Sequence, residues 1–125
     1  MKFIETSDAP LPAGHYTQAV VANGFVFVSG ILPIAPGSGE RRIPGGIDAQ
    51  ARQVFANLRA ILVASESDIS KLVNVQIFIP DVVLWAAVNS IYTEVLGAHK
   101  PARTVVPCGP LHFNALIELN AVATC

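Results

Sequence analysis

The sequence predicts an α+β fold, in which one mixed β-sheet carries two helices on one of its faces. Three observations lead to this prediction: a hairpin signal near the N-terminus, two amphipathic helical stretches, and strand-like runs on both sides of each helix. A chain of 125 residues is shorter than the roughly 150 residues of an average domain, so a single domain spanning residues 1–125 is expected.

A β-hairpin opens the fold. Two β-prone runs, residues 16–22 and 25–29, are joined by Asn23 and Gly24. This pair tolerates positive φ at both central positions of a tight turn, which favours antiparallel strands on either side of it.

Two shorter features flank the hairpin. Phe3 and Ile4 are expected to form a short first strand. Residues 33–46 contain three prolines and four glycines, a composition typical of a surface loop.

Two helices follow the loop. Asp48 is expected to cap the first helix, and Pro80-Asp81 is expected to end the next strand and cap the second helix. Gly97 is a natural terminator of that second helix. Apolar residues recur at intervals of three and four, which predicts one buried face per helix; they are Ile47, Ala51, Val54, Leu58 and Ile61 in the first and Leu84, Val88, Ile91 and Val95 in the second.

The remaining strands follow from alternation and from β-prone runs. Aliphatic side chains occupy every second position from residue 73 to 79, the period of a strand. Further strands are expected near residues 103–106 and through residues 115–123. Each strand–helix–strand crossover is expected to bring two strands together as parallel neighbours.

The composition predicts self-association. Hydrophobic residues make up 52% of the chain and charged residues 14%, against about 25% charged residues in an ordinary soluble domain. With both helices on one face, the other face of the sheet is bare, and the sequence has few polar side chains to cover it. We therefore expect that face to be a subunit interface.

Hydropathy and charge argue against several classes of protein. The most apolar windows, residues 20–34 and 77–88, are interrupted by glycine, proline and polar residues, so no membrane span is expected. The N-terminus lacks the apolar region of a secretory signal, which favours a cytoplasmic protein whose Cys108 and Cys125 are free thiols.

A net charge of −1, from 8 basic and 9 acidic residues, does not favour nucleic-acid binding.

No metal or cofactor is expected either. His15, His99 and His112 lie far apart in the sequence, and the common phosphate-loop, dinucleotide, zinc and nucleophile-elbow motifs are absent.

Two isolated charges are the strongest candidates for function. Glu118 lies in an otherwise apolar final strand, where a carboxylate must be paired, hydrogen-bonded or raised in pKa. It is either half of a structural salt bridge or a general acid/base. Arg103 opens a strand just after Pro101-Ala102, and its planar guanidinium suits a substrate carboxylate. An ion pair between Arg103 and Glu118 would make both residues structural.

Three further residues are weaker candidates. Ser29 and Gly30 end the hairpin either in a plain turn or at a point where the backbone approaches another group closely, because glycine lacks a side chain. Tyr16 is either an ordinary half-buried strand tyrosine or a residue of the site.

Six segments occur in the order and spacing of one known family, and together they cover essentially the whole chain. They resemble the Rid family of reactive intermediate deaminases, also called YjgF-like proteins. The segments are GHYTQAV (14–20), VSG (28–30), AQARQVFANL (49–58), VNSIY (88–92), KPAR (100–103) and LIEL (116–119).

The resemblance implies a chorismate-mutase-like α+β domain, a homotrimer with ligand clefts between subunits, and no metal or cofactor. It implies hydrolysis of enamine or imine acids, of the 2-aminoacrylate/2-iminopropionate type, to a 2-keto acid and ammonia. By motif, Arg103 matches the arginine that binds the substrate carboxylate, Glu118 matches the catalytic acid, and Tyr16 and Ser29 match cleft residues.

The chain departs from the family pattern at three positions. Val105 stands where deaminases of the family usually have a cysteine, so only its backbone is expected to contact ligand, and Cys108 is not equivalent to that cysteine by position. His15 replaces a usual proline and Ile31 a frequent glutamine. These changes leave open a non-catalytic trimer that binds keto or imino acids, and, more remotely, an endoribonuclease.

Overall fold

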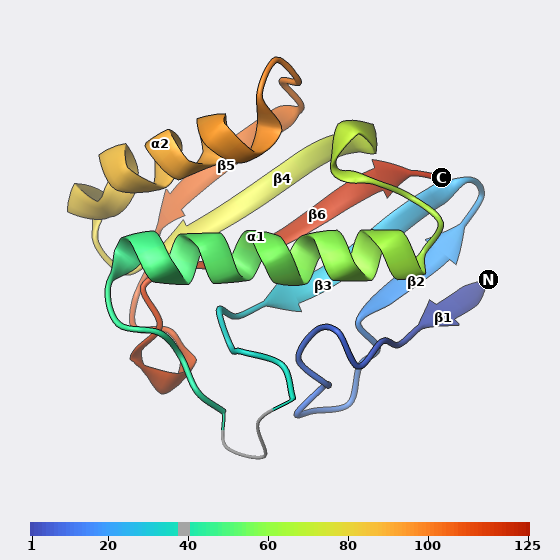
Figure 1. The fold of residues 1–125 in the computed structure, drawn as a ribbon, viewed down its shortest axis with the longest axis horizontal. Coiled ribbons are helices and arrows are strands. Elements are labelled where there is room, and N and C mark those ends of the chain that lie inside the picture. Colours follow the sequence, from blue (N-terminus) through green and yellow to red (C-terminus); the bar gives the residue numbers. More distant parts are fainter. Residues whose placement is uncertain (38–40) are drawn as a thin grey trace.

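The computed structural model describes residues 1–37 and 41–125, and its main chain forms a six-stranded sheet with two helices on one face (Figure 1). All the predicted helices and strands are present. The strands are β1 (Lys2–Ile4), β2 (Ala19–Ala22), β3 (Phe25–Ile31), β4 (Leu72–Ile79), β5 (Ala102–Pro107) and β6 (Glu118–Thr124), and the helices are α1 (Ile47–Ala64) and α2 (Trp85–Leu96).

The order of the strands corrects one prediction about the crossovers. The sheet runs β1-β2-β3-β6-β4-β5. The second crossover gives parallel neighbours, β4 and β5, as expected. The first does not, because β6 lies between β3 and β4 and pairs antiparallel with both. The last strand takes this central place because Leu119, Ala121 and Ala123 are all buried on its helix-facing side.

The core lies between the helices and the sheet. Both helices lie in front of the same sheet face in Figure 1, as the sequence predicts. The apolar stripe of α1 is almost wholly inaccessible, and the rings of Phe55 on α1 and Tyr92 on α2 meet edge to face with centroids 5.8 Å apart. Burial of these apolar surfaces is the main force that holds the two layers together.

Two predicted caps and two strand starts differ in the structure. Gly46, with φ of 85°, precedes α1, while Asp48 lies inside its first turn. Asp81 caps a short 3-10 turn before α2, where its carboxylate accepts from the Val83 N–H at 3.0 Å.

Strand β2 begins at Ala19 and β6 at Glu118, because the segments before them fold into bends and a 3-10 turn. Gly97 ends α2 as predicted, donating its N–H to the Thr93 carbonyl at 2.9 Å.

The start of the proline- and glycine-rich loop is attached to α1 by hydrogen bonds. Residues 38–40 of the predicted loop 33–46 lie outside the described residues. Asn57, which is 1% exposed, donates from its side-chain amide to the carbonyls of Leu32 and Ile34, each at 3.0 Å. A backbone hydrogen bond from the Ala35 N–H to the Arg42 carbonyl, 2.9 Å long, joins the start of the loop to its later part.

Substitution of Asn57 by alanine is expected to lower the free energy of unfolding by about 2–4 kcal/mol, because two carbonyls would lose their common donor. Urea unfolding measures the effect. Arg59→Ala, at an exposed position of the same helix, is the control and should change the value by less than about 0.5 kcal/mol. Equal stabilities of the two variants would contradict the prediction.

The second face of the sheet is uncovered within one chain and carries a row of apolar side chains. Phe3 pairs with Val20, Val20 with Phe27, and Phe27 with Val122 across four strands. Phe3 is 71% exposed and Phe27 is 48% exposed. We call these four side chains the open-face row. None of the helices in residues 1–37 and 41–125 is long and apolar enough to cross a membrane.

Candidate functional site

A cavity of about 710 Å³ lies where β3 ends and β6 begins. A volume of this size suits a small-molecule ligand. Its walls are mostly apolar, and a few polar side chains also line it. The apolar lining includes Leu11, Ile31, Leu32, Ile34, Ile61 and Phe113, and the polar lining consists of Tyr16, Gln18, Ser29, Arg41, His112 and Glu118.

A bulge in β3 forms one wall of this cavity. Val28 pairs with Ala121 and Ile31 with Leu119, so β3 has one extra residue between these two pairs. Bulges of this kind redirect side chains and are common beside active sites. Ser29 and Gly30 lie at the bulge, and the Ser29 hydroxyl donates to the Thr17 carbonyl at 2.6 Å.

Gly30 leaves room for the carboxyl group of Glu118. A Cβ atom at Gly30 would lie 3.6 Å from the carboxyl carbon and from Oε1 of Glu118. Of the two alternatives for Ser29-Gly30, a plain turn and a close approach of the backbone to another group, the structure shows the second, and the neighbouring group is Glu118. Any side chain longer than alanine at this position would occupy the space in front of the carboxyl group.

Among the described residues that line this cavity, Glu118 is the only carboxylate. Desolvation raises its pKa above the ordinary value of 4.5, and the positive charge of His112 offsets part of that rise. In the part of the chain that the structure describes, the salt bridge between Arg52 and Glu94 is the only one found, so Glu118 has no ion-pair partner there. A half-buried carboxyl group with a raised pKa is suited to proton transfer near neutral pH.

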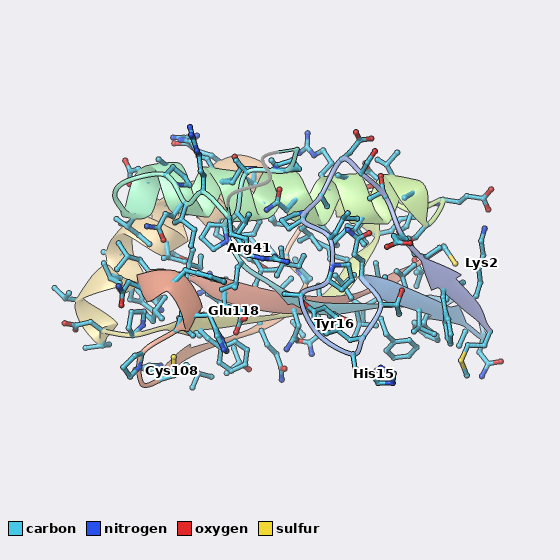
Figure 2. All side chains as sticks on the ribbon, turned by 90° about the horizontal axis from the view of Figure 1, so that it is seen from below. Lys2, His15, Tyr16, Arg41, Cys108 and Glu118 are labelled. Atoms are coloured by element: carbon cyan, nitrogen blue, oxygen red, sulfur yellow. The ribbon has the colours of Figure 1, made fainter. Side chains whose placement is uncertain are left out.

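Tyr16 lines the cavity but is not a strand residue. It lies in a bend three residues before β2, its N–H donates to the Gly14 carbonyl at 3.0 Å, and its side chain is 51% exposed. The prediction of a half-buried strand tyrosine is therefore wrong, and its place at the cavity is the alternative that the structure supports. Figure 2 shows Tyr16, Glu118 and Arg41 at the end of the molecule that faces the viewer.

Gln18 holds the segment that carries Tyr16 against the rest of the chain. It is 3% exposed. Its amide donates to the carbonyls of Thr6 and Pro10 at 3.1 and 2.8 Å, and its side-chain oxygen accepts from the Thr6 N–H at 2.7 Å. The sequence analysis did not single out Gln18, since a glutamine beside a strand has no distinctive pattern.

Arg103 lies away from this cavity, on edge strand β5. Register shows why: Arg103 pairs with Val75 and Glu118 with Phe78, and these two positions of β4 point to opposite faces of the sheet. Arg103 donates to the Asn89 side chain at 2.8 Å, and its guanidinium carbon lies 4.7 Å from the centroid of the Tyr92 ring. Among the described residues, the predicted alternative of an Arg103–Glu118 salt bridge within one chain is therefore wrong.

Val105 and Cys108 are also outside the cavity lining. Val105 lies on the helix-facing side of β5 and packs against the core. Cys108 is a free thiol whose S–H donates to the Gly109 carbonyl at 3.1 Å, and Cys125 is a second free thiol. The structure thus brings together Tyr16, Ser29, Gly30 and Glu118 and leaves Arg103 and Val105 on a different surface of the same chain.

Besides Gln18, two polar cavity residues were not predicted from the sequence as site residues. His112 belongs to a 3-10 turn (His112–Asn114) in which Phe113 and Asn114 have positive φ, and Arg41 comes from the proline- and glycine-rich loop. The available signal for Arg41 was its position in the only arginine doublet of a weakly charged chain. Within residues 1–37 and 41–125, no three His, Cys, Asp or Glu side chains gather where they could hold a metal ion.

Comparison with known proteins gives one consistent family. The family model described as Endoribonuclease L-PSP matches residues 6–125. A RutC family protein of Pyrococcus horikoshii is 39% identical over 120 residues, which is 96% of this chain and 94% of that protein. Reactive Intermediate Deaminase A, a chloroplastic protein of Arabidopsis thaliana, is 36% identical over 121 residues, which is 97% of this chain and 64% of that protein.

Solved structures agree with this result. The crystal structure of RidA from an Antarctic bacterium, Psychrobacter sp., superposes with a TM-score of 0.95 at 29% identity and covers all of both chains. Likeness at this level over the full length of both chains shows that they share the same fold.

Proposed function

The chain belongs to the Rid family, whose model carries the description Endoribonuclease L-PSP, and on this premise we propose that it hydrolyses small enamine or imine acids to 2-keto acids and ammonia. The observation that carries the proposal is Glu118, a half-buried carboxyl group with a raised pKa in a largely apolar cavity. The name of the Arabidopsis relative, Reactive Intermediate Deaminase A, supports the same reaction class.

The proposed reaction needs a protonated imine, one water molecule and three proton transfers, with a fourth that regenerates the Glu118 carboxylate. Water adds to the carbon of the protonated imine, and Glu118 takes a proton from that water as the new carbon–oxygen bond forms, which leaves a neutral carbinolamine. Glu118 returns this proton to the nitrogen; the carbon–nitrogen bond then breaks, ammonia leaves, and Glu118 takes the hydroxyl proton as the oxygen becomes the carbonyl of the keto acid. The proton now on Glu118 passes to the released ammonia. Tyr16 and Ser29 line the space in which the substrate is held.

The carboxylate of the substrate requires a cation, and we propose that Arg103 of a neighbouring subunit supplies it. Within one chain Arg103 points to the helix-facing side of β5, whereas Glu118 lies on the other face. Strand β5 is at the edge of the sheet, so its outer backbone groups and Arg103 can meet another chain. In this proposal three chains assemble with one cleft at each of three interfaces.

The open-face row supports assembly on physical grounds, because apolar side chains on an uncovered sheet face are stabilised by contact with identical surfaces. Light scattering at micromolar concentration should therefore give three times the 13.2 kDa mass of one chain. Phe27→Asp, in the middle of the row, is expected to shift the mass toward that of one chain, since a charge would be buried unpaired.

Val63→Asp is the matched control for this experiment. Val63 is also an exposed apolar residue, 61% exposed, but it lies on α1. This variant should retain the mass of the unaltered protein. A monomer mass for the unaltered protein would contradict the proposed assembly.

To test turnover, amino-acid oxidases generate the imines in the assay mixture. Semicarbazide traps the imine that remains, so that its lifetime can be followed. The protein should shorten that lifetime in proportion to its concentration. Binding of 2-keto acids without any acceleration would favour the alternative of a non-catalytic binding trimer. The ribonuclease alternative has no support in the charge of the chain, which is −1 overall.

A further inference from the structure

Arg41 is a cation in the wall of the cavity that holds Glu118, and it comes from the same chain. It lines this cavity and a smaller neighbouring one next to Pro10 and Leu11. Figure 2 shows its side chain in the space between the helix layer and the sheet, at the same end of the molecule as Glu118 and Tyr16. The backbone hydrogen bond between Ala35 and Arg42 fixes the residue that follows it.

The charge of Arg41 is not used by the carboxylate in the same cavity. No salt bridge within 4.0 Å joins Arg41 to a carboxylate of the described residues. Glu118 and Arg41 therefore form no direct ion pair, and the guanidinium is available to a second group of a ligand that also reaches the carboxyl group.

Arg41 and Glu118 line the same largely apolar cavity, so a ligand that contacts both side chains has an anionic group at Arg41. A three-carbon imino acid has one carboxylate, which the proposed function assigns to Arg103 of a neighbouring subunit. Such a ligand would leave Arg41 with no anionic partner among the described residues.

From this placement of Arg41 we infer that the site takes dicarboxylic substrates: imino or enamine acids whose side chain ends in a second carboxylate that binds Arg41. This inference rests on the proposed function, because it assigns the first carboxylate to Arg103 and the imine to Glu118. It makes Arg41 the residue that determines specificity for the side chain of the substrate.

The experiment compares ligands of equal chain length with and without the second carboxylate. The imines of aspartate and 2-aminobutyrate, and of glutamate and norvaline, are generated in place and their hydrolysis is measured. In parallel, 2-oxoglutarate and 2-oxovalerate are titrated calorimetrically. The protein should prefer the dicarboxylic member in at least one imine pair, and it should bind 2-oxoglutarate more tightly than 2-oxovalerate.

Arg41→Gln should reduce kcat/KM for the dicarboxylic imine and affinity for 2-oxoglutarate by about 10- to 100-fold, as expected for loss of a charge-assisted contact. It should change the monocarboxylic values by less than about twofold, because those ligands have no second carboxylate for Arg41 to bind. Arg41→Lys should retain part of the preference. Arg42→Gln removes the same charge one residue away, outside the cavity lining, and should retain all of it.

Two different failures can be separated. If imines are hydrolysed but Arg41→Gln weakens both members of a pair equally, or neither, the dicarboxylic inference is overturned while the proposed function stands. If no imine is hydrolysed and 2-oxoglutarate binds in a way that depends on Arg41, the deaminase function fails and recognition of the second carboxylate by Arg41 stands.

Discussion

Glu118→Gln is expected to slow imine hydrolysis by about 10²–10⁴-fold, the usual contribution of one general acid/base group. Glutamine keeps the shape and hydrogen-bonding capacity of the side chain but cannot take a proton from water. Binding of a keto-acid product should change little, because Arg103 of the neighbouring subunit is proposed to hold its carboxylate. The measurement is a single-turnover rate at saturating imine, together with a product titration.

Stability provides the control for this variant. Burial raises the pKa of Glu118 above 4.5, so between that ordinary value and the raised one the folded chain binds more protons than the unfolded chain, and stability falls as pH rises. Removing the ionisable group should abolish this pH dependence, and Glu118→Gln should melt no lower than the unaltered protein at neutral pH. A large loss of stability or of assembly with unchanged turnover per site would show that Glu118 has a structural role.

The pH profile of the rate follows from the same shift. Glu118 acts as a base only when ionised, so activity should fall on the acid side of its raised pKa. The acid limb of kcat is expected above pH 4.5, the ordinary value for glutamate.

Arg103→Ala is expected to weaken binding of a keto-acid product by roughly 10- to 100-fold, equivalent to about 1.5–3 kcal/mol for a charge-assisted contact. The rate at saturating substrate should fall less than in Glu118→Gln, because the group that transfers the proton is still present. Removing Arg103 also leaves the Asn89 side chain without its donor, so a thermal melt must accompany the titration. Arg103→Lys keeps the charge and should recover part of the affinity.

The division of the site between two chains makes a stronger prediction. Co-expression of Arg103→Ala chains with Glu118→Gln chains should restore about a quarter of the activity per site, because random assembly places an intact Arg103 beside an intact Glu118 in that fraction of clefts. The control is Glu118→Gln co-expressed with a chain that carries both substitutions, in which no cleft contains the carboxylate. Absence of restoration in the first mixture would contradict a site shared between subunits.

Local patterns in the sequence were enough to locate all the strands and both helices. Asn23-Gly24 specifies a turn through its own backbone preferences, and the spacing of apolar residues distinguishes the helices from the strands, because each depends only on residues close in the chain. The unusual environment of Glu118 was visible for the same reason, since a carboxylate in an apolar strand stands out from its immediate neighbours. The predicted ends of helices and strands were less accurate where the flanking chain determines them. Tyr16, for example, was predicted to begin a strand that starts at Ala19.

The tertiary structure alone decided which residues share a site. Strand order depends on pairing between distant segments, so nothing near β3 or β4 in the sequence indicates that β6 lies between them. That insertion brings Glu118 to the bulge at Ser29 and Gly30, and the register of β4 with β5 turns Arg103 to the opposite face. Arg41 lines the cavity beside Arg42, which is hydrogen-bonded to Ala35, and Asn57 on α1 holds the carbonyls of Leu32 and Ile34, contacts between residues far apart in the chain that no local pattern encodes.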